Sequence, residues 1–168
     1  MLIKNLLTLS MLSGAIIALT GAMHSPSIAP NGPDAVAATL DAFHAAASKA
    51  NFNAYLALFA PDGVFLGTDG TERWTVEEFK TYCRPYFDKG QGWTYTAIEG
   101  KRFITIADDG TVAWFDELLT NDKYGTCRGS GVLRRIGDDW RIAQYSLAFT
   151  IPNDVAKDVV ALVNARQK

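Results

Sequence analysis

The sequence predicts an α+β domain in which an antiparallel sheet carries its helices on one face. Two periodicities support this class: apolar residues recur every three or four positions early in the chain, and they alternate from residue 93 onward. Glycine- and aspartate-rich turns separate the alternating segments. This order, with helices first and consecutive strands later, is typical of helices segregated to one side of an antiparallel sheet.

Three helices are expected before the consecutive strands. The first spans residues 33–50, because Pro33 suits a first helical position and the residues after it form one apolar face. That face consists of Val36, Leu40, Phe43, Ala47 and Ala50. A second, short helix is expected over residues 53–60. A capping box at Thr75 begins the third helix, which Pro85 ends or kinks.

The expected strands are residues 64–67, 93–99, 102–107, 112–119, 126–136 and 140–151. Gly137-Asp138-Asp139 lies between the last two and predicts a hairpin. Pro152 ends the sheet, and Asp154 caps a final helix that carries valines and a leucine on one face.

Composition restricts the class of protein without naming its chemistry. The 168 residues are 48% hydrophobic and 11% aromatic, which predicts one compact domain with a sizeable core. The formal net charge is −2, and nucleic-acid binders need a basic face for phosphates. We therefore expect no nucleic-acid partner.

The N-terminal residues have the pattern of an export signal. Lys4 precedes a largely apolar run that no charged residue interrupts, and Thr20-Gly21-Ala22 supplies the small residues that signal peptidase requires. The run is shorter than the ~20 apolar residues that span a bilayer, so no permanent membrane anchor is expected. We predict a signal peptide at residues 1–22, a tether at 23–32 and one domain at 33–168. The mature protein is then periplasmic or secreted.

Neither cysteine chemistry nor metal chemistry is indicated. Export permits a disulfide between Cys83 and Cys127, although two buried thiols that pack as small hydrophobes are the favoured interpretation. His24 and His44 are the two histidines, and neither stands in a good arrangement with a cysteine. No cluster of His and Cys has ligand spacing, so we expect no metal and no cofactor.

Several segments resemble the SnoaL-like branch of the nuclear transport factor 2-like superfamily, from about residue 35 to residue 151. The segments are Phe65-Leu66-Gly67-Thr68-Asp69-Gly70-Thr71-Glu72-Arg73-Trp74, Ala113-Trp114-Phe115-Asp116-Glu117, Arg128-Gly129-Ser130-Gly131-Val132-Leu133, Trp140-Arg141-Ile142-Ala143-Gln144-Tyr145 and Ile151-Pro152-Asn153. The resemblance implies a cone-shaped fold whose curved sheet and helices enclose an apolar pocket. It also implies a homodimer that pairs through the outer sheet face. This fold hosts several enzyme activities and non-catalytic domains, so it does not determine function.

Two neighbouring carboxylates are the candidate acid–base groups. Asp116 and Glu117 lie in the middle of an expected strand, where a charge is costly unless it is paired. Strand alternation places them on opposite faces. The catalytic hypothesis makes Asp116 the general acid or base, with Arg128 or Tyr145 orienting it or stabilising an oxyanion. The alternative is a structural ion pair between Arg128 and either carboxylate.

Aromatic residues supply the expected ligand-binding wall. The predicted ligand contacts are Trp74, Tyr82, Tyr86, Trp93, Trp114, Glu117 and Ser130. Core packing explains each aromatic residue equally well, so only the cluster as a whole indicates a ligand. Two functions follow: an exported binder of a small apolar molecule, or a metal-independent isomerase, dehydratase or hydrolase with a pocket carboxylate.

Overall fold

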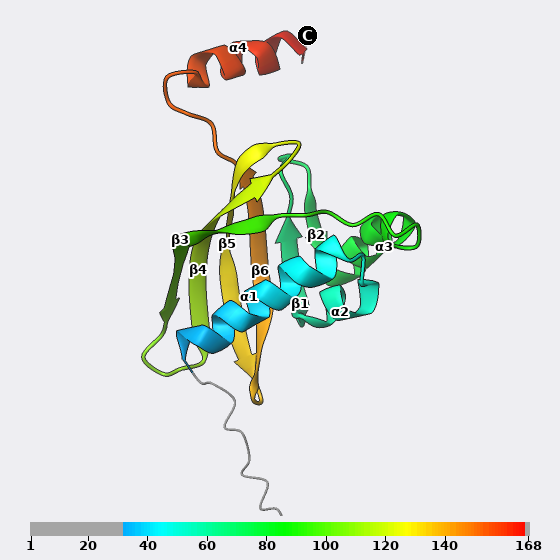
Figure 1. Ribbon diagram of the computed structural model, residues 1–168, viewed down its shortest axis with the longest axis vertical. Helices are drawn as coiled ribbons and strands as arrows, with labels where there is room; N and C mark the ends of the chain where they lie inside the picture. Colours follow the sequence, from blue (N-terminus) through cyan, green and yellow to red (C-terminus); the bar gives the residue numbers. More distant parts are fainter. Residues whose placement is uncertain (1–31, 167–168) are drawn as a thin grey trace, which may run out of the picture.

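The computed structural model describes residues 32–166 and has four helices and six strands in that range (Figure 1). The helices are α1 (Pro33–Ser48), α2 (Phe52–Ala57), α3 (Val76–Phe87) and α4 (Ala156–Arg166). The strands are β1 (Phe59–Leu66), β2 (Arg73–Thr75), β3 (Thr96–Ile106), β4 (Val112–Asn121), β5 (Gly125–Ile136) and β6 (Asp139–Phe149). The predicted signal peptide at 1–22 lies outside the described residues, as does the tether except for Gly32.

The six strands form one curved sheet in the order β2-β1-β6-β5-β4-β3, with α1, α2 and α3 on one face (Figure 1). The α+β class is therefore confirmed. The sheet is mixed, however, because β1 pairs parallel with β6 while the other neighbours are antiparallel. The long connection through α3 and β3–β5 brings the chain back beside β1 in the same direction.

Three boundaries differ from the expected ones. β1 begins at Phe59, so α2 is shorter than predicted and the Pro61–Gly63 turn lies in an irregular part of the strand. The short strand β2 was not expected. The two strands predicted at 93–99 and 102–107 form the single strand β3, which continues through a register shift where Gly100 adopts a φ of +69°.

α3 begins at the predicted capping box. The Thr75 hydroxyl accepts from the Glu78 backbone N–H, and the Glu78 carboxylate accepts from the Thr75 backbone N–H. Pro85 does not end the helix, which reaches Phe87. Phe79, Cys83 and Phe87 are buried on its inner face.

A bulge in β6 decides which side chains face the helices. Gly131 lies opposite Tyr145 and Leu133 lies opposite Ile142, so Ala143 is an extra residue in β6. Trp140 and Ile142 before the bulge are buried, and so are Tyr145 and Leu147 after it. Sequence alternation alone placed these two pairs on opposite faces, and that expectation is wrong because the bulge shifts the alternation by one residue.

The outer sheet face and α4 carry exposed apolar side chains. Phe103 and Trp114 are among the exposed residues of the outer face. α4 confirms the predicted final helix, but none of its residues is buried, and it projects from the domain (Figure 1). Between residues 32 and 166, no helix has the length and hydropathy needed to cross a membrane.

Candidate functional site

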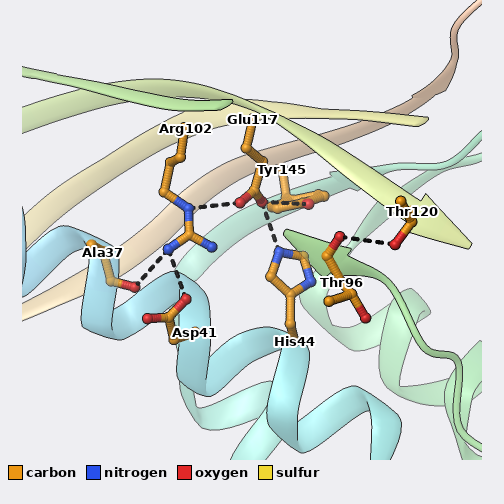
Figure 2. A network of polar contacts seen from close by, with 8 residues as sticks. All are labelled: Ala37, Asp41, His44, Thr96, Arg102, Glu117, Thr120 and Tyr145. Atoms are coloured by element: carbon orange, nitrogen blue, oxygen red, sulfur yellow. Dashed lines mark hydrogen bonds and ion pairs between the residues drawn. The ribbon is translucent and has the colours of Figure 1, made fainter. Parts of the chain in front are cut away.

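Glu117 is a fully buried carboxylate in the middle of β4, on the face of the sheet that the helices cover (Figure 2). Its Oε1 accepts hydrogen bonds from Nε2 of His44 at 2.7 Å and from the Tyr145 hydroxyl at 3.1 Å. Its Oε2 accepts from Nε of Arg102 at 2.8 Å. The carboxylate therefore joins α1, β3 and β6 to β4 through three donors, which is how a buried charge is stabilised.

Arg102 connects Glu117 to α1. It lies directly opposite Glu117 in the β3–β4 ladder, and its Nη1 donates to Oδ1 of Asp41 at 2.7 Å and to the Ala37 carbonyl at 3.3 Å. Its Nη2 is buried without a hydrogen-bond partner among the described residues. Asp41 is largely exposed, so its pair with Arg102 contributes less than the buried pair with Glu117.

The donors set the charge state of the site. Burial alone raises the pKa of Glu117, but the hydrogen bond and charge of His44, together with those of Arg102, outweigh burial and hold that pKa below its usual range. Burial and the adjacent Glu117 charge raise the pKa of Tyr145 well above its usual value. Near neutral pH the site therefore contains an ionised Glu117 and a protonated Tyr145.

An aromatic pocket approaches this network from one side. Its outer chamber has a volume of about 230 Å³. The chamber is lined by Phe65, Gly67, Thr68, Glu72, Trp74, Phe79, Tyr82, Trp93, Tyr95, Tyr124 and Leu147. A narrow inner chamber of about 20 Å³ shares Phe65, Trp93, Tyr95 and Leu147 with the outer one and also contacts Phe43, His44, Ala47, Tyr55 and Tyr145. The two chambers therefore adjoin and share part of their walls, and together they are called the tapering pocket.

His44 is the polar group of the network that both faces the pocket and can exchange protons. Glu117 does not line either chamber, whereas His44 and Tyr145, which both bond to it, line the inner one. The His44 side chain is 12% exposed, and its Nδ1 has no hydrogen-bond partner within residues 32–166. In the neutral tautomer that donates Nε2–H to Glu117, Nδ1 carries a lone pair that can accept a proton or hydrogen bond, whereas in the charged ring both nitrogens are donors.

The structure places the preferred acid–base candidate away from the pocket. Asp116 is exposed on the outer sheet face, opposite Phe103 and Ser130. Arg128 is exposed on the same face and lies opposite Leu118. The expectations that Asp116 lies in the pocket and that Arg128 lies opposite a carboxylate are therefore wrong. The first error concerns the facing of β4, in which residues 113, 115, 117 and 119 are the buried set. The second concerns the register between β4 and β5, which places Leu118 opposite Arg128.

Some of the predicted ligand contacts line the outer chamber and others lie away from it. Trp74, Tyr82 and Trp93 line the outer chamber, and their contact with a ligand stays a prediction. Tyr86 is exposed on α3 and does not line the chamber. Trp114 and Ser130 lie on the outer sheet face, so their placement in the pocket is wrong. Tyr145 does reach the inner chamber and the carboxylate, although the carboxylate is Glu117 rather than Asp116.

His44, Arg102 and Tyr95 were not among the site residues that the sequence predicted. A signal existed for the first two. His44 lies one turn after Leu40 and next to Phe43 on the apolar face of α1. Arg102 alternates in phase with Ile104 and Ile106, which places it on the inner face of β3. The alternation of Ala113, Phe115 and Leu119 also marked the face of Glu117 as the buried one. Tyr95 lies before β3 in an irregular segment, where periodicity does not show on which side of the chain a side chain lies.

Cys83 and Cys127 are free, buried thiols. Burial raises the pKa of Cys83 to about 12 and also raises that of Cys127. These findings agree with the interpretation as packed hydrophobes rather than a disulfide. No group of three or more His, Cys, Asp or Glu side chains is arranged to hold a metal ion in the described part of the chain.

Comparison with known proteins identifies the family. The model of the SnoaL-like domain matches residues 36–152, well over half of the chain. No curated protein sequence matches. Many solved structures are similar to the chain, among them three at low identity. A nuclear transport factor 2-like protein of unknown function from Pseudomonas putida KT2440 aligns with a TM-score of 0.57 at 12% identity, over 71% of this chain and 87% of that one.

The other two are also proteins of unknown function. One from Nostoc punctiforme PCC 73102 has a cystatin-like fold and aligns with a TM-score of 0.54 at 17% identity, over 69% of this chain and 89% of that one. The other, from the DUF3225 family of Pectobacterium atrosepticum SCRI1043, aligns with a TM-score of 0.58 at 17% identity, over 72% of this chain and 94% of that one. At these identities the likeness concerns the fold alone. The chain belongs to the SnoaL-like domain family, within the nuclear transport factor 2-like fold.

Proposed function

We propose that the protein binds a small, flat, largely apolar molecule in the tapering pocket, with the inner end of the molecule against His44. The observation that carries the proposal is the lining of the outer chamber, in which Trp74, Tyr82, Trp93 and Tyr95 surround about 230 Å³. Pockets of this kind, mostly aromatic with a few fixed polar groups, are typical of small-molecule sites.

The chamber volume limits the size of the ligand. One water occupies about 30 Å³ of liquid, so 230 Å³ corresponds to roughly seven or eight waters. A one- or two-ring compound fits this space, whereas the inner chamber of about 20 Å³ holds only a single small polar group or a water. The ligand therefore presents one small group to His44 and keeps its rings among the aromatic side chains.

Calorimetric titration with indole, 2-naphthol and tert-butylbenzene tests binding. Leu147→Phe is the blocking variant, because Leu147 lines both chambers. Leu118→Phe is its matched control, since Leu118 carries the same change on the outer face. Binding that is weakened by Leu147→Phe and unchanged by Leu118→Phe supports the proposal. Absence of binding to any of these compounds by the folded wild-type protein contradicts it.

A second candidate function is proton transfer by His44. The observation that favours it is the 2.7 Å contact between Nε2 of His44 and the ionised Glu117, which leaves Nδ1 without a partner in the described structure. Such a carboxylate orients the ring, selects the Nε2–H tautomer and stabilises the imidazolium that forms. The Tyr95 hydroxyl lines the same inner chamber and can donate to an oxygen of the ligand.

Deuterium exchange at the α-carbon of 2-tetralone, followed by NMR, tests this candidate. Nδ1 would take the α-proton and the enolate oxygen would receive a hydrogen bond. General-base catalysis contributes about 10²–10⁴-fold, so exchange is expected above the buffer rate, lost in His44→Gln and reduced in Glu117→Gln. Asp116→Asn should leave the rate unchanged. Binding of 2-tetralone without catalysed exchange would leave the protein as a binder only.

A further inference from the structure

Glu72 is the single charged side chain among the described residues that line the outer chamber. The residues around it are overwhelmingly aromatic, and the chamber has no lysine or arginine in its lining. A carboxylate at the edge of an aromatic pocket needs either water or a positive partner. This combination resembles neither a purely apolar site nor an anion site.

The loop after β1 fixes the position of this carboxylate. Oε2 of Glu72 accepts from the Asp69 backbone N–H at 3.1 Å, and the Glu72 carbonyl accepts from the Gly67 N–H at 2.8 Å. A β-carbon at position 67 would overlap the Glu72 carboxylate, so the glycine is what allows the side chain to fold back over the loop. Oε1 has no hydrogen-bond partner in the described region and remains available.

Aromatic side chains near Glu72 supply electron-rich faces. Trp74 and Tyr82 are stacked with ring centres 4.5 Å apart, and Trp93 lies 6.1 Å from Tyr82. Burial is the main cause that raises the pKa of Tyr82 and of Tyr95, the latter to about 12, and the negative charge of Glu72 adds to both shifts. The phenols therefore stay protonated near neutral pH, and the field of Glu72 reaches both rings.

Other charges near the pocket are already paired. Arg102 is balanced by Glu117 and Asp41 behind the inner chamber. At the mouth, Nζ of Lys123 lies 4.9 Å from the centre of the Tyr124 ring. The chain thus places an ammonium of its own on one ring of the chamber wall, while no cation of residues 32–166 is recorded on Trp74, Tyr82 or the Glu72 carboxylate.

We propose that the outer chamber takes a small organic cation, a quaternary or tertiary ammonium on a flat apolar body, with the charged group beside Glu72 and the aromatic faces. This inference rests on the proposed ligand-binding function and names the class of ligand. A neutral ring would desolvate Glu72 without compensation, and an anion would be repelled by it. An ammonium gains both cation–π attraction and the charge of Glu72, and its methyl groups weaken its hydration. A compact metal ion is disfavoured because one carboxylate and aromatic carbon cannot replace its oxygen ligands.

The test compares two molecules of nearly the same shape that differ in charge. Phenyltrimethylammonium carries the cation, and tert-butylbenzene is its neutral counterpart. Binding is measured by calorimetry, and by fluorescence of Trp74 and Trp93, in three proteins: wild type, Glu72→Gln and Glu99→Gln. Glutamine at 72 can still accept from the Asp69 N–H, so the loop is preserved, and Glu99 is an exposed carboxylate outside the chamber lining.

The expected result is a wild-type preference for the cation that falls about five- to tenfold in Glu72→Gln and is unchanged in Glu99→Gln. Binding of tert-butylbenzene should be equal or tighter in Glu72→Gln. If tert-butylbenzene binds and the cation does not, or if Glu72→Gln leaves their ratio unchanged, the ligand class is wrong and the pocket function stands. If the folded wild-type protein binds neither molecule, both the ligand class and the proposed binding function are contradicted.

Discussion

Gly129 lies directly opposite Glu117 in the β4–β5 ladder, and the space above its α-carbon holds the Tyr145 hydroxyl that donates to the Glu117 carboxylate. A β-carbon at this position would overlap that hydroxyl and lie 3.0 Å from Oε1 of Glu117. Glycine within a strand commonly marks a bend in the sheet. The structure shows a more specific reason for the glycine, since any side chain would displace the third donor of a buried charge.

Gly129→Ala should therefore destabilise the protein through Tyr145. We expect a loss of about 2 kcal/mol, within the range for overpacking a well-packed interior. The double variant Gly129→Ala/Tyr145→Phe should be more stable than the sum of the two single changes implies, because phenylalanine removes the oxygen that the new methyl meets. Urea unfolding of the four proteins measures this coupling. Strict additivity would show that position 129 acts through the backbone instead.

Removing the charge of Glu117 should cost more than removing any single donor. Glu117→Gln leaves Arg102 buried beside a neutral amide, and breaking a buried pair costs about 3 kcal/mol or more. For a domain of this size, that lowers the melting temperature by roughly 6–12 °C. Asp116→Asn is the control on the adjacent residue and should change stability by less than about 0.5 kcal/mol. Calorimetry or thermal unfolding by circular dichroism distinguishes the two.

The lowered pKa of Glu117 predicts an acid-dependent part of the stability. In the unfolded chain the carboxyl has a pKa of about 4.3. Just below that value the unfolded state binds a proton that the folded state does not, so the contribution is complete above about pH 4.3 and is lost as the pH falls through the folded pKa. The difference in unfolding free energy between wild type and Glu117→Gln should shrink over this window. The pKa values of the exposed residues Asp69, Asp109 and Glu78 are lowered too. Because wild type and Glu117→Gln both contain these carboxylates, their contribution cancels when the two unfolding free energies are subtracted.

The outer sheet face predicts a homodimer. Trp114 is 48% exposed and Phe103 is 61% exposed on that face. Adjacent large apolar side chains in contact with water favour burial against a second copy. Light scattering should give a dimer at micromolar concentration, and Trp114→Glu should give a folded monomer. Lys89→Glu, on the exposed turn after α3, should remain dimeric. A monomeric wild-type protein would contradict the prediction.

The buried thiols predict slow chemical modification. The pKa of Cys83 is about 12 because of burial, so very little thiolate exists at pH 8. Ellman's reagent should therefore react slowly with the folded protein and release two equivalents of thiol when urea unfolds it. Release of no thiol from unfolded protein would instead demonstrate a bridge between Cys83 and Cys127.

Periodicity predicted most of the fold and only part of the candidate site. The helices and long strands were found because their burial repeats at 3.6 or 2 residues, and α3 was located by its capping box. The sequence identified Asp116 and Glu117 as the two candidate carboxylates. Choosing between them required knowing which face of β4 is buried. His44 and Arg102 reach Glu117 from α1 and β3. Which residues bond to this carboxylate depends on helix packing and strand register, and no single segment of the sequence encodes either. The bulge at Ala143 was invisible to alternation for the same reason.

That bulge has a further consequence for β6. On its C-terminal side the strand supplies Tyr145 to the buried carboxylate, and on its N-terminal side it supplies Trp140 and Ile142 to the core. Deleting one residue at the bulge would restore simple alternation and turn one of these groups toward solvent. The presence of the extra residue therefore decides which face of the sheet each later residue of β6 occupies. A relative that loses this extra residue can keep the tyrosine inside only by exchanging apolar and polar residues along the rest of the strand.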